Sequence, residues 1–304
     1  MADKEEKNPA VVKLLGEISQ SAGPRQELIG GIQEKLGGCV VSFFTSFNYP
    51  VMIEDADADM IEDLLRSCDL GQGLTLILNS PGGSGLAAER IVNICRSYSG
   101  GSFTVIVPKM AKSAATMICM GASNVQMSTT AELGPIDPQV IVTKDGQNPM
   151  VMSVHSIVSS YKKLLRKAID LKTGKNLDPL LMQLGNYDPR EIAEYEKFQT
   201  LSVSIAVSLL STGMLAGKPE KEIKQLIEPF TDPTVTQAHG RPIAPDMARK
   251  AGLKIEDIAL DNPIWDSIWE LYVRSNHYVN TQAAKLAETK NHSFEARPPR
   301  VEIN

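Results

Sequence analysis

The first half of the chain alternates between two hydrophobic patterns. Runs of mostly apolar residues at 39–46, 73–79 and 101–108 are short and bounded by glycine, serine or proline, which predicts buried strands. Between them, residues 57–68 and 85–98 carry apolar positions three and four apart, the spacing of an amphipathic helix. Strand followed by helix, repeated in this way, predicts an α/β core whose strands run parallel.

The same alternation continues for one more unit. Residues 111–122 are small or apolar and predict a helix, and residues 123–128 predict a short strand. An ordered turn is expected at 131–139, followed by an edge strand at 140–147.

Beyond residue 152 the pattern becomes helical. Long periodic stretches at 153–174, 188–213 and 218–230 predict helices that cover the core or project from it as an arm. The expected organisation is a helical leader at 1–35, a domain at 36–262 with a helical arm at about 151–230, and a C-terminal helix with an extended tail at 263–304.

The composition is that of an ordinary globular protein: 42% of the 304 residues are hydrophobic, 22% are charged and the formal net charge is −5. This charge predicts no basic surface for nucleic acid. The N-terminus lacks the pattern of a signal peptide and no apolar run is long enough for a membrane span, so we expect a cytoplasmic protein. The four cysteines lack the spacing of a metal site, and Cys95 and Cys119 lie among apolar residues, which favours a reducing compartment.

The first segment that suggests chemistry is the turn N-S-P-G-G-S at 79–84, between a predicted strand and a predicted helix. Such glycine turns let a ligand approach backbone N–H groups. One interpretation is a dinucleotide site, because Gly83, Gly85 and Ala88 fit the pattern G-x-G-x-x-A. However, the next strand ends in Pro108 rather than in the acidic residue that would hold a ribose. The other interpretation is an oxyanion hole, in which N–H groups bind the oxygen of a reacting carbonyl.

The next strand–turn–helix unit places Ser113 at or near the first residue of a helix. Unpaired N–H groups at a helix N-terminus stabilise negative charge, and the small neighbours Ala111, Ala114 and Ala115 leave room for a substrate. A serine in this place is also a common helix N-cap. Parallel strands end at one edge of a sheet, so the glycine turn and Ser113 are expected side by side. This pairing favours a serine nucleophile beside an oxyanion hole.

Three segments in this order resemble the Clp protease and crotonase superfamily. They are N-S-P-G-G at 79–83, A-K-S-A-A-T at 111–116 and G-P-I-D-P-Q at 134–139. Within the superfamily the chain is most similar to the serine dehydrogenase proteinases, in the branch of ClpP and signal-peptide peptidase A. The resemblance implies an α/β fold of the ClpP/crotonase-like kind, with stacked β–turn–α units and a helical second half.

The resemblance also assigns roles to individual residues. Ser113 would be the nucleophile, and the N–H groups of Gly83 and Ala114 would form the oxyanion hole, with Gly82 shaping the turn. The family order Ser, Asp, His fits Ser113, Asp137 and a later histidine, since a serine hydroxyl needs a base to remove its proton. Asp137 would orient that histidine, although an aspartate before proline often only caps a turn.

Two histidines and a lysine cluster are candidates for the base. His239, in T-Q-A-H-G-R-P-I, is the first choice, and His155, at the start of a long predicted helix, is the second. A serine–lysine dyad is the alternative, although clustered lysines on one helix are expected to be solvated. The candidate lysines are Lys162, Lys163 and Lys167.

The function implied by the resemblance is a serine peptidase that hydrolyses peptide bonds through a Ser113 acyl-enzyme, with no metal or other cofactor. The expected partners are a peptide or protein substrate and further copies of this chain, because the fold commonly assembles into rings or stacked oligomers. Two alternatives stay open at this stage: a crotonase-like acyl-CoA enzyme, which needs no serine nucleophile, and an inactive scaffold that keeps the fold without a base.

Overall fold

The computed structural model describes residue 11 and residues 21–143, 149–171, 177–232 and 241–297. Within these residues a seven-stranded sheet has the order β11-β10-β1-β2-β3-β5-β9. The five strands from β1 to β9 in this order run parallel to one another. Strand β10 pairs antiparallel with β1, and β11 pairs antiparallel with β10. The strands are β1 (Cys39–Thr45), β2 (Leu74–Asn79), β3 (Thr104–Val107), β5 (Asn124–Met127), β9 (Ile255–Asp257), β10 (Lys285–Glu288) and β11 (Ser293–Ala296).

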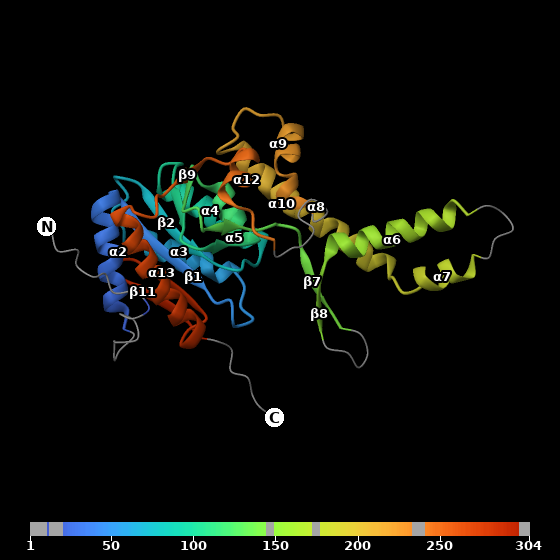
Figure 1. Ribbon diagram of the computed structural model, residues 1–304, viewed down its shortest axis with the longest axis horizontal. Coiled ribbons are helices and arrows are strands. Elements are labelled where there is room, and N and C mark those ends of the chain that lie inside the picture. The colour runs from blue at the N-terminus through green and yellow to red at the C-terminus, as the bar shows by residue number, and fades with distance from the viewer. Residues whose placement is uncertain (1–10, 12–20, 144–148, 172–176, 233–240, 298–304) are drawn as a thin grey trace, which may run out of the picture.

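Both faces of this sheet are covered by helices, which explains why its central strands read as continuous apolar runs. Successive side chains of a strand point to opposite faces. Val41 and Phe43 therefore pack with one cluster, and Val40 and Phe44 with the other. The first face carries α3 (Asp55–Arg66), α4 (Gly85–Tyr98) and α5 (Ala114–Gly121), and the second carries α2 (Ala22–Leu36) and α13 (Pro263–Thr281) (Figure 1).

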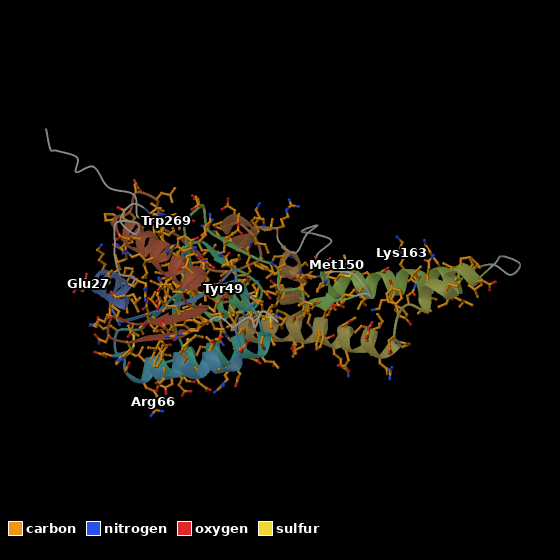
Figure 2. All side chains as sticks on the ribbon, turned by 90° about the horizontal axis from the view of Figure 1, so that it is seen from below. Glu27, Tyr49, Arg66, Met150, Lys163 and Trp269 are labelled. Carbon is orange, nitrogen blue, oxygen red and sulfur yellow. A yellow bond between two sulfur atoms is a disulfide. The ribbon has the colours of Figure 1, made fainter. Side chains whose placement is uncertain are left out.

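Figure 2 shows this layering from the side, with Arg66 at the end of α3 and Trp269 of α13 on opposite sides of the body. The parallel α/β core expected from the alternating pattern is thus confirmed.

The two ends of the described chain meet in the body. Helix α2 packs on α13, and strands β10 and β11 extend the sheet beyond β1. No strand was expected at β10, because its sequence is K-L-A-E and the hydrophobic pattern is interrupted at both ends. The structure explains this: Lys285 and Glu288 are buried in ion pairs with Asp57 and Arg25, so charged residues occupy core positions.

A helical arm projects from the body (Figure 1), as the long periodic stretches predicted. It consists of α6 (Val154–Ile169), α7 (Asp178–Leu184) and the first half of α8 (Pro189–Ser211). Helix α7 has no buried residue among those described, whereas the second half of α8 is buried against the body through Ile205, Leu209 and Leu210. Three short helices follow on the body: α9 (Glu220–Leu226), α10 (Glu228–Thr231) and α12 (Pro245–Lys250).

A strand was expected at 140–147 on the edge of the main sheet, and this placement is wrong. Strand β7 (Gln139–Val142) pairs with β8 (Met150–Ser153) in an antiparallel hairpin outside the seven-stranded sheet. Strand β7 has the sequence Q-V-I-V, a short apolar run that fits the edge of the main sheet as well as a separate hairpin, and the sequence did not identify β8 as its partner. The expected turn at 131–139 also contains a short strand, β6 (Glu132–Leu133), which pairs with β4 (Met110–Ala111).

The cysteines behave in two ways. Cys95 and Cys119 are buried as expected, and burial raises the pKa of the Cys95 thiol to about 12. Cys39 and Cys68, however, form a disulfide between the start of β1 and the second residue after α3. This bond does not fit the reducing compartment that the cysteine pattern favoured. In the described parts of the chain, no helix is long and apolar enough to cross a membrane.

Candidate active site

The glycine turn is clamped by the backbone of Ile53. The Ile53 N–H donates to the Gly82 carbonyl over 2.8 Å, and the Ser84 N–H donates to the Ile53 carbonyl over 2.8 Å. Gly82 has φ 109° and Gly83 has φ 154°, conformations that residues with a side chain rarely adopt. A Cβ on Gly83 would lie 2.2 Å from the Ile53 nitrogen, so the clamp itself requires glycine.

This clamp leaves one backbone donor uncommitted. In the parallel bridge between Ile53 and Gly83, the bonds are made by Gly82 and Ser84, the neighbours of Gly83. Among the hydrogen bonds of the described residues, none uses the Gly83 N–H. Gly83 lines the cleft described below, so its N–H is available to a ligand there.

A buried serine fixes the same turn from the other side. The Ser80 hydroxyl accepts the Gly82 N–H over 3.0 Å and lies 2.6 Å from the Thr45 hydroxyl. The Ser80 carbonyl accepts the Lys112 N–H over 3.0 Å, which ties the glycine turn to the residue before Ser113. Sequence reasoning missed Ser80 and Thr45, because a polar residue at a strand end gives no signal of its partner.

Ser113 lies between β4 and α5 in a strained conformation. Its φ is 51° and its ψ is −119°, and in the described chain it is the only residue other than glycine with positive φ. Such a conformation costs about 1–3 kcal/mol and persists where the surrounding structure imposes it, which is common at functional sites. The Ser113 side chain makes no capping hydrogen bond to α5, so the helix-cap interpretation lacks the bond that defines it.

The two turns approach each other closely. A Cβ on Gly82 would lie 2.6 Å from the Ser113 Cβ and 3.0 Å from the Ala114 nitrogen. Ala114 is the first residue of α5, and no hydrogen bond within the described residues uses its N–H. The structure therefore brings the Ser113 side chain and two uncommitted N–H groups, of Gly83 and Ala114, to one place.

The two turns border a cleft of about 450 Å³. Gly82, Gly83, Ser113 and Asp137 all line it, as expected for residues of one site. Asp137 is 3% exposed. The rest of the lining includes nine large apolar side chains, from Val51, Met52, Leu86, Met117, Ile136, Val140, Phe198, Leu201 and Ile205.

The segment that carries Asp137 is tied to α5 by a threonine. The buried Thr116 hydroxyl lies 2.8 Å from the Ala111 carbonyl and 2.9 Å from the Gly134 carbonyl, and it accepts the Gly134 N–H over 3.2 Å. Thr116 thus connects the helix that follows Ser113 to the turn that leads to Asp137. Like Ser80 and Thr45, Thr116 was not identified from the sequence.

The candidate bases differ in their placement. His155 lies in the first turn of α6, half-buried, and its neighbour Val154 donates its N–H to the Pro138 carbonyl over 3.0 Å. His155 is thus near the Asp137 segment, although it is not among the residues that line the cleft. His239 lies outside the described residues.

The lysines lie elsewhere. Lys162 is half-exposed and pairs with Glu196 of α8 over 2.6 Å. Lys163, labelled in Figure 2, and Lys167 are exposed on the same helix. Lys112, next to Ser113, is 2.5 Å from the Glu132 carboxylate and also reaches the Leu133 carbonyl. None of these four lines the cleft.

A family model described as ClpP-like SDH-type serine proteinase matches residues 25–178, about half of the chain. The chain belongs to this family. The resemblance stated from the three sequence segments and the ClpP-like fold are thus confirmed. The match to the ClpP-like serine proteinase family includes the glycine turn, Ser113, Asp137 and His155, and it ends before His239.

Two relatives are uncharacterized proteins of Methanocaldococcus jannaschii. One is 27% identical over 249 residues, which are 81% of this chain and 73% of the relative. The other is 32% identical over 123 residues, which are 40% of this chain and 37% of that relative. A solved structure, a mutant of the 1510-N membrane-bound stomatin-specific protease, is 17% identical with a TM-score of 0.29, over 47% of this chain and 72% of its own. A similarity of that size supports no conclusion about this chain.

Proposed function

We propose that this member of the ClpP-like serine proteinase family is a serine peptidase that cleaves peptide bonds through a Ser113 acyl-enzyme. The observation that carries the proposal is the strained Ser113, whose side chain does not cap its helix and which faces the same cleft as Gly83. A helix cap requires neither the strain nor a cleft.

The proposed reaction uses the two uncommitted N–H groups. The Ser113 oxygen attacks the peptide carbonyl, and the oxygen of that carbonyl becomes negative as the tetrahedral intermediate forms. The N–H groups of Gly83 and Ala114 donate to it, and donors that are already fixed stabilise such charge most effectively. The amine product then leaves, and water releases the acid product from Ser113.

For the base we propose a histidine that Asp137 orients. His239 is the first choice and His155 is the second. The support is the burial of Asp137 at the cleft and the position of α6 beside Pro138. If an imidazole is the base, activity should rise with pH, with a midpoint at about pH 6.5. His239→Ala should abolish this rise, while His155→Ala should leave it in place. A double His155→Ala/His239→Ala variant that keeps full activity would exclude both, and Lys162, Lys163 and Lys167 would be tested next.

Assembly into a homo-oligomer is part of the proposal. The β7–β8 hairpin stands outside the main sheet and exposes Ile141, Met150 and Val151, each more than half accessible. Exposed apolar residues that cluster on one element are typical of a contact surface.

A fluorophosphonate probe tests the enzyme class directly. In the labelling step the Ser113 oxygen forms a bond to phosphorus, fluoride leaves, and the hydroxyl proton passes to the base. We expect mass spectrometry to find the phosphonyl group on Ser113, no adduct in Ser113→Ala, and normal labelling of Ser202→Ala, a control serine that lines the same cleft. An unlabelled wild-type chain would favour the acyl-CoA enzyme or the inactive scaffold instead.

A further inference from the structure

The clamp residue Ile53 is itself held in place by the start of α3. Glu54, the next residue, is the N-cap of that helix, and its N–H donates to the Asp57 carboxylate over 2.8 Å. Because Ile53 binds Gly82 and Ser84 through its backbone, any shift of Glu54 moves the glycine turn. Asp57 therefore restrains the position of the turn without touching it.

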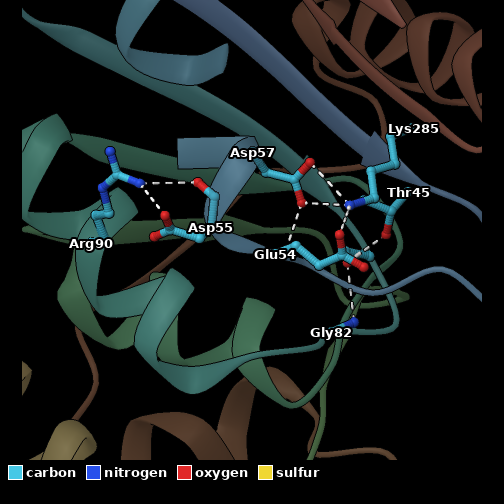
Figure 3. A network of polar contacts seen from close by, with 8 residues as sticks. Thr45, Glu54, Asp55, Asp57, Gly82, Arg90 and Lys285 are labelled. Atoms are coloured by element: carbon cyan, nitrogen blue, oxygen red, sulfur yellow. Dashed lines mark hydrogen bonds and ion pairs between the residues drawn. The ribbon is translucent and has the colours of Figure 1, made fainter. Parts of the chain in front are cut away.

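Asp57 is paired with a lysine from the other end of the chain. The Lys285 ammonium lies 2.9 and 3.1 Å from the two Asp57 oxygens, and the two residues are 6% and 4% exposed (Figure 3). A capping carboxylate does not require a buried cation, and burial raises the pKa of Asp57 although Lys285 lies beside it. Buried ion pairs gain little net stability over apolar residues of the same volume, so stability alone is a weak reason for this pair.

The strand partner of Lys285 supports the same turn from the other side. Lys285 of β10 lies opposite Thr45 of β1 in the antiparallel ladder. The Thr45 hydroxyl contacts Ser80, which accepts the Gly82 N–H. The pair Thr45–Lys285 is thus connected to the Gly82 N–H through Ser80. It is connected to the Gly82 carbonyl through Asp57, Glu54 and Ile53.

We propose that the cross-strand pair Thr45–Lys285, acting through Ser80 and Asp57, is a positioning device that keeps the Gly83 N–H aimed into the cleft. The inference rests on the proposed function, because it assigns a role toward the oxyanion hole. Lys285 lies on a strand beyond the family match at 25–178, so the device recruits the C-terminal segment to the site.

The same strand supplies a matched control. Glu288 of β10 is fully buried and takes two hydrogen bonds of 2.8 Å from Arg25, which is 4% exposed. This pair joins β10 to α2 on the far end of the strand, and it makes no hydrogen bond to the glycine turn among the described residues. Removing it breaks a buried ion pair of similar burial without touching the proposed device.

The experiment compares Asp57→Ala with Glu288→Ala in the full chain. The measurements are the second-order rate of Ser113 labelling by a fluorophosphonate, kcat and KM for a fluorogenic peptide, and Tm. We expect both variants to lose Tm, but only Asp57→Ala to lose about tenfold or more in labelling rate and in kcat, with KM little changed. Lys285→Met, which removes the ammonium that holds the Asp57 carboxylate, should also slow labelling, and a wild-type rate in this variant would contradict the role of Lys285.

The labelling rates distinguish failure of the positioning role from failure of the proposed function. Equal labelling rates in Asp57→Ala and Glu288→Ala, with wild type labelled normally, would overturn the positioning role and leave the proposed function intact. No labelling of the wild type would overturn both. If Asp57→Ala does not fold, Thr45→Val takes its place: a several-fold slower labelling at a similar Tm supports the device, and an unchanged rate contradicts it.

Discussion

Two turns of the same kind meet at the cleft, and they handle the same backbone problem in opposite ways. Each follows a strand and begins a helix, and each contains a residue with positive φ. In the first turn the residues with positive φ are Gly82 and Gly83, and glycine adopts such angles at little steric cost. In the second it is Ser113, which carries a Cβ and bears the strain. The first turn thus leaves the Gly83 N–H uncommitted, while the second presents the Ser113 side chain beside the Ala114 N–H.

The serines at the two helix starts show the same contrast. Ser84 begins α4 and its hydroxyl accepts the Ala87 N–H over 3.3 Å, the ordinary bond of an N-cap. Ser113 begins α5 and makes no such bond. The two serines occupy equivalent N-cap positions, but the Ser84 hydroxyl caps its helix and the Ser113 hydroxyl does not.

Replacing Ser113 should cause the largest loss of activity, because it removes the side chain that distinguishes the second turn from the first. Ser113→Ala and Ser113→Gly should each lose peptidase activity by at least about a thousandfold, because the nucleophile is gone. Ser113→Gly should be more stable than Ser113→Ala by about 1 kcal/mol, since glycine relieves the strain. Ser84→Ala should instead lose about 1 kcal/mol of stability with its cap.

Urea unfolding and peptide turnover of the three variants check this. If Ser113→Gly is no more stable than Ser113→Ala, the strain assigned to Ser113 is absent.

A methyl group on Gly82 should be the next largest perturbation. In Gly82→Ala the new Cβ would meet the Lys112 carbonyl at 2.5 Å and would push the two turns apart. We expect activity to fall about a hundredfold or more, in line with the loss of an oxyanion donor. Gly101→Ala is the matched control, because Gly101 also has positive φ, at 95°, but no atom lies within 4 Å of its added Cβ.

Both glycine variants should lose stability, and only Gly82→Ala should lose activity. Equal activity in the two would show that the close approach of the turns is irrelevant to function.

The smallest effect is expected at the connection between α5 and the Asp137 segment. Thr116→Val removes a buried hydroxyl that contacts the Ala111 and Gly134 backbone, and should lower the free energy of unfolding by about 1–3 kcal/mol. Activity should fall only a few-fold, because neither turn is directly changed. Thr116→Ser keeps the hydroxyl and should restore activity, while a Thr116→Ser as slow as Thr116→Val would contradict the role of the hydroxyl.

The sequence predicted the elements that depend on local pattern. The parallel core strands and the meeting of the glycine turn with Ser113 follow from short-range spacing and from the geometry of parallel sheets, whereas a place for Asp137 beside them was implied only by the family resemblance. The contacts that hold the turns in place were not predicted. Thr45, Asp57 and Lys285 each look unremarkable in sequence, and only the pairing of β10 with β1 brings them together. The Cys39–Cys68 disulfide was missed for the same reason.

We propose that the two turns form one oxyanion hole around the Ser113 hydroxyl. The most direct measurement is a crystal structure of the chain after reaction with a fluorophosphonate. We expect a phosphonyl group on the Ser113 oxygen, with its free oxygen about 2.7–3.1 Å from the nitrogens of both Gly83 and Ala114. A phosphonyl oxygen that points into solvent, or an adduct on another residue, would contradict it.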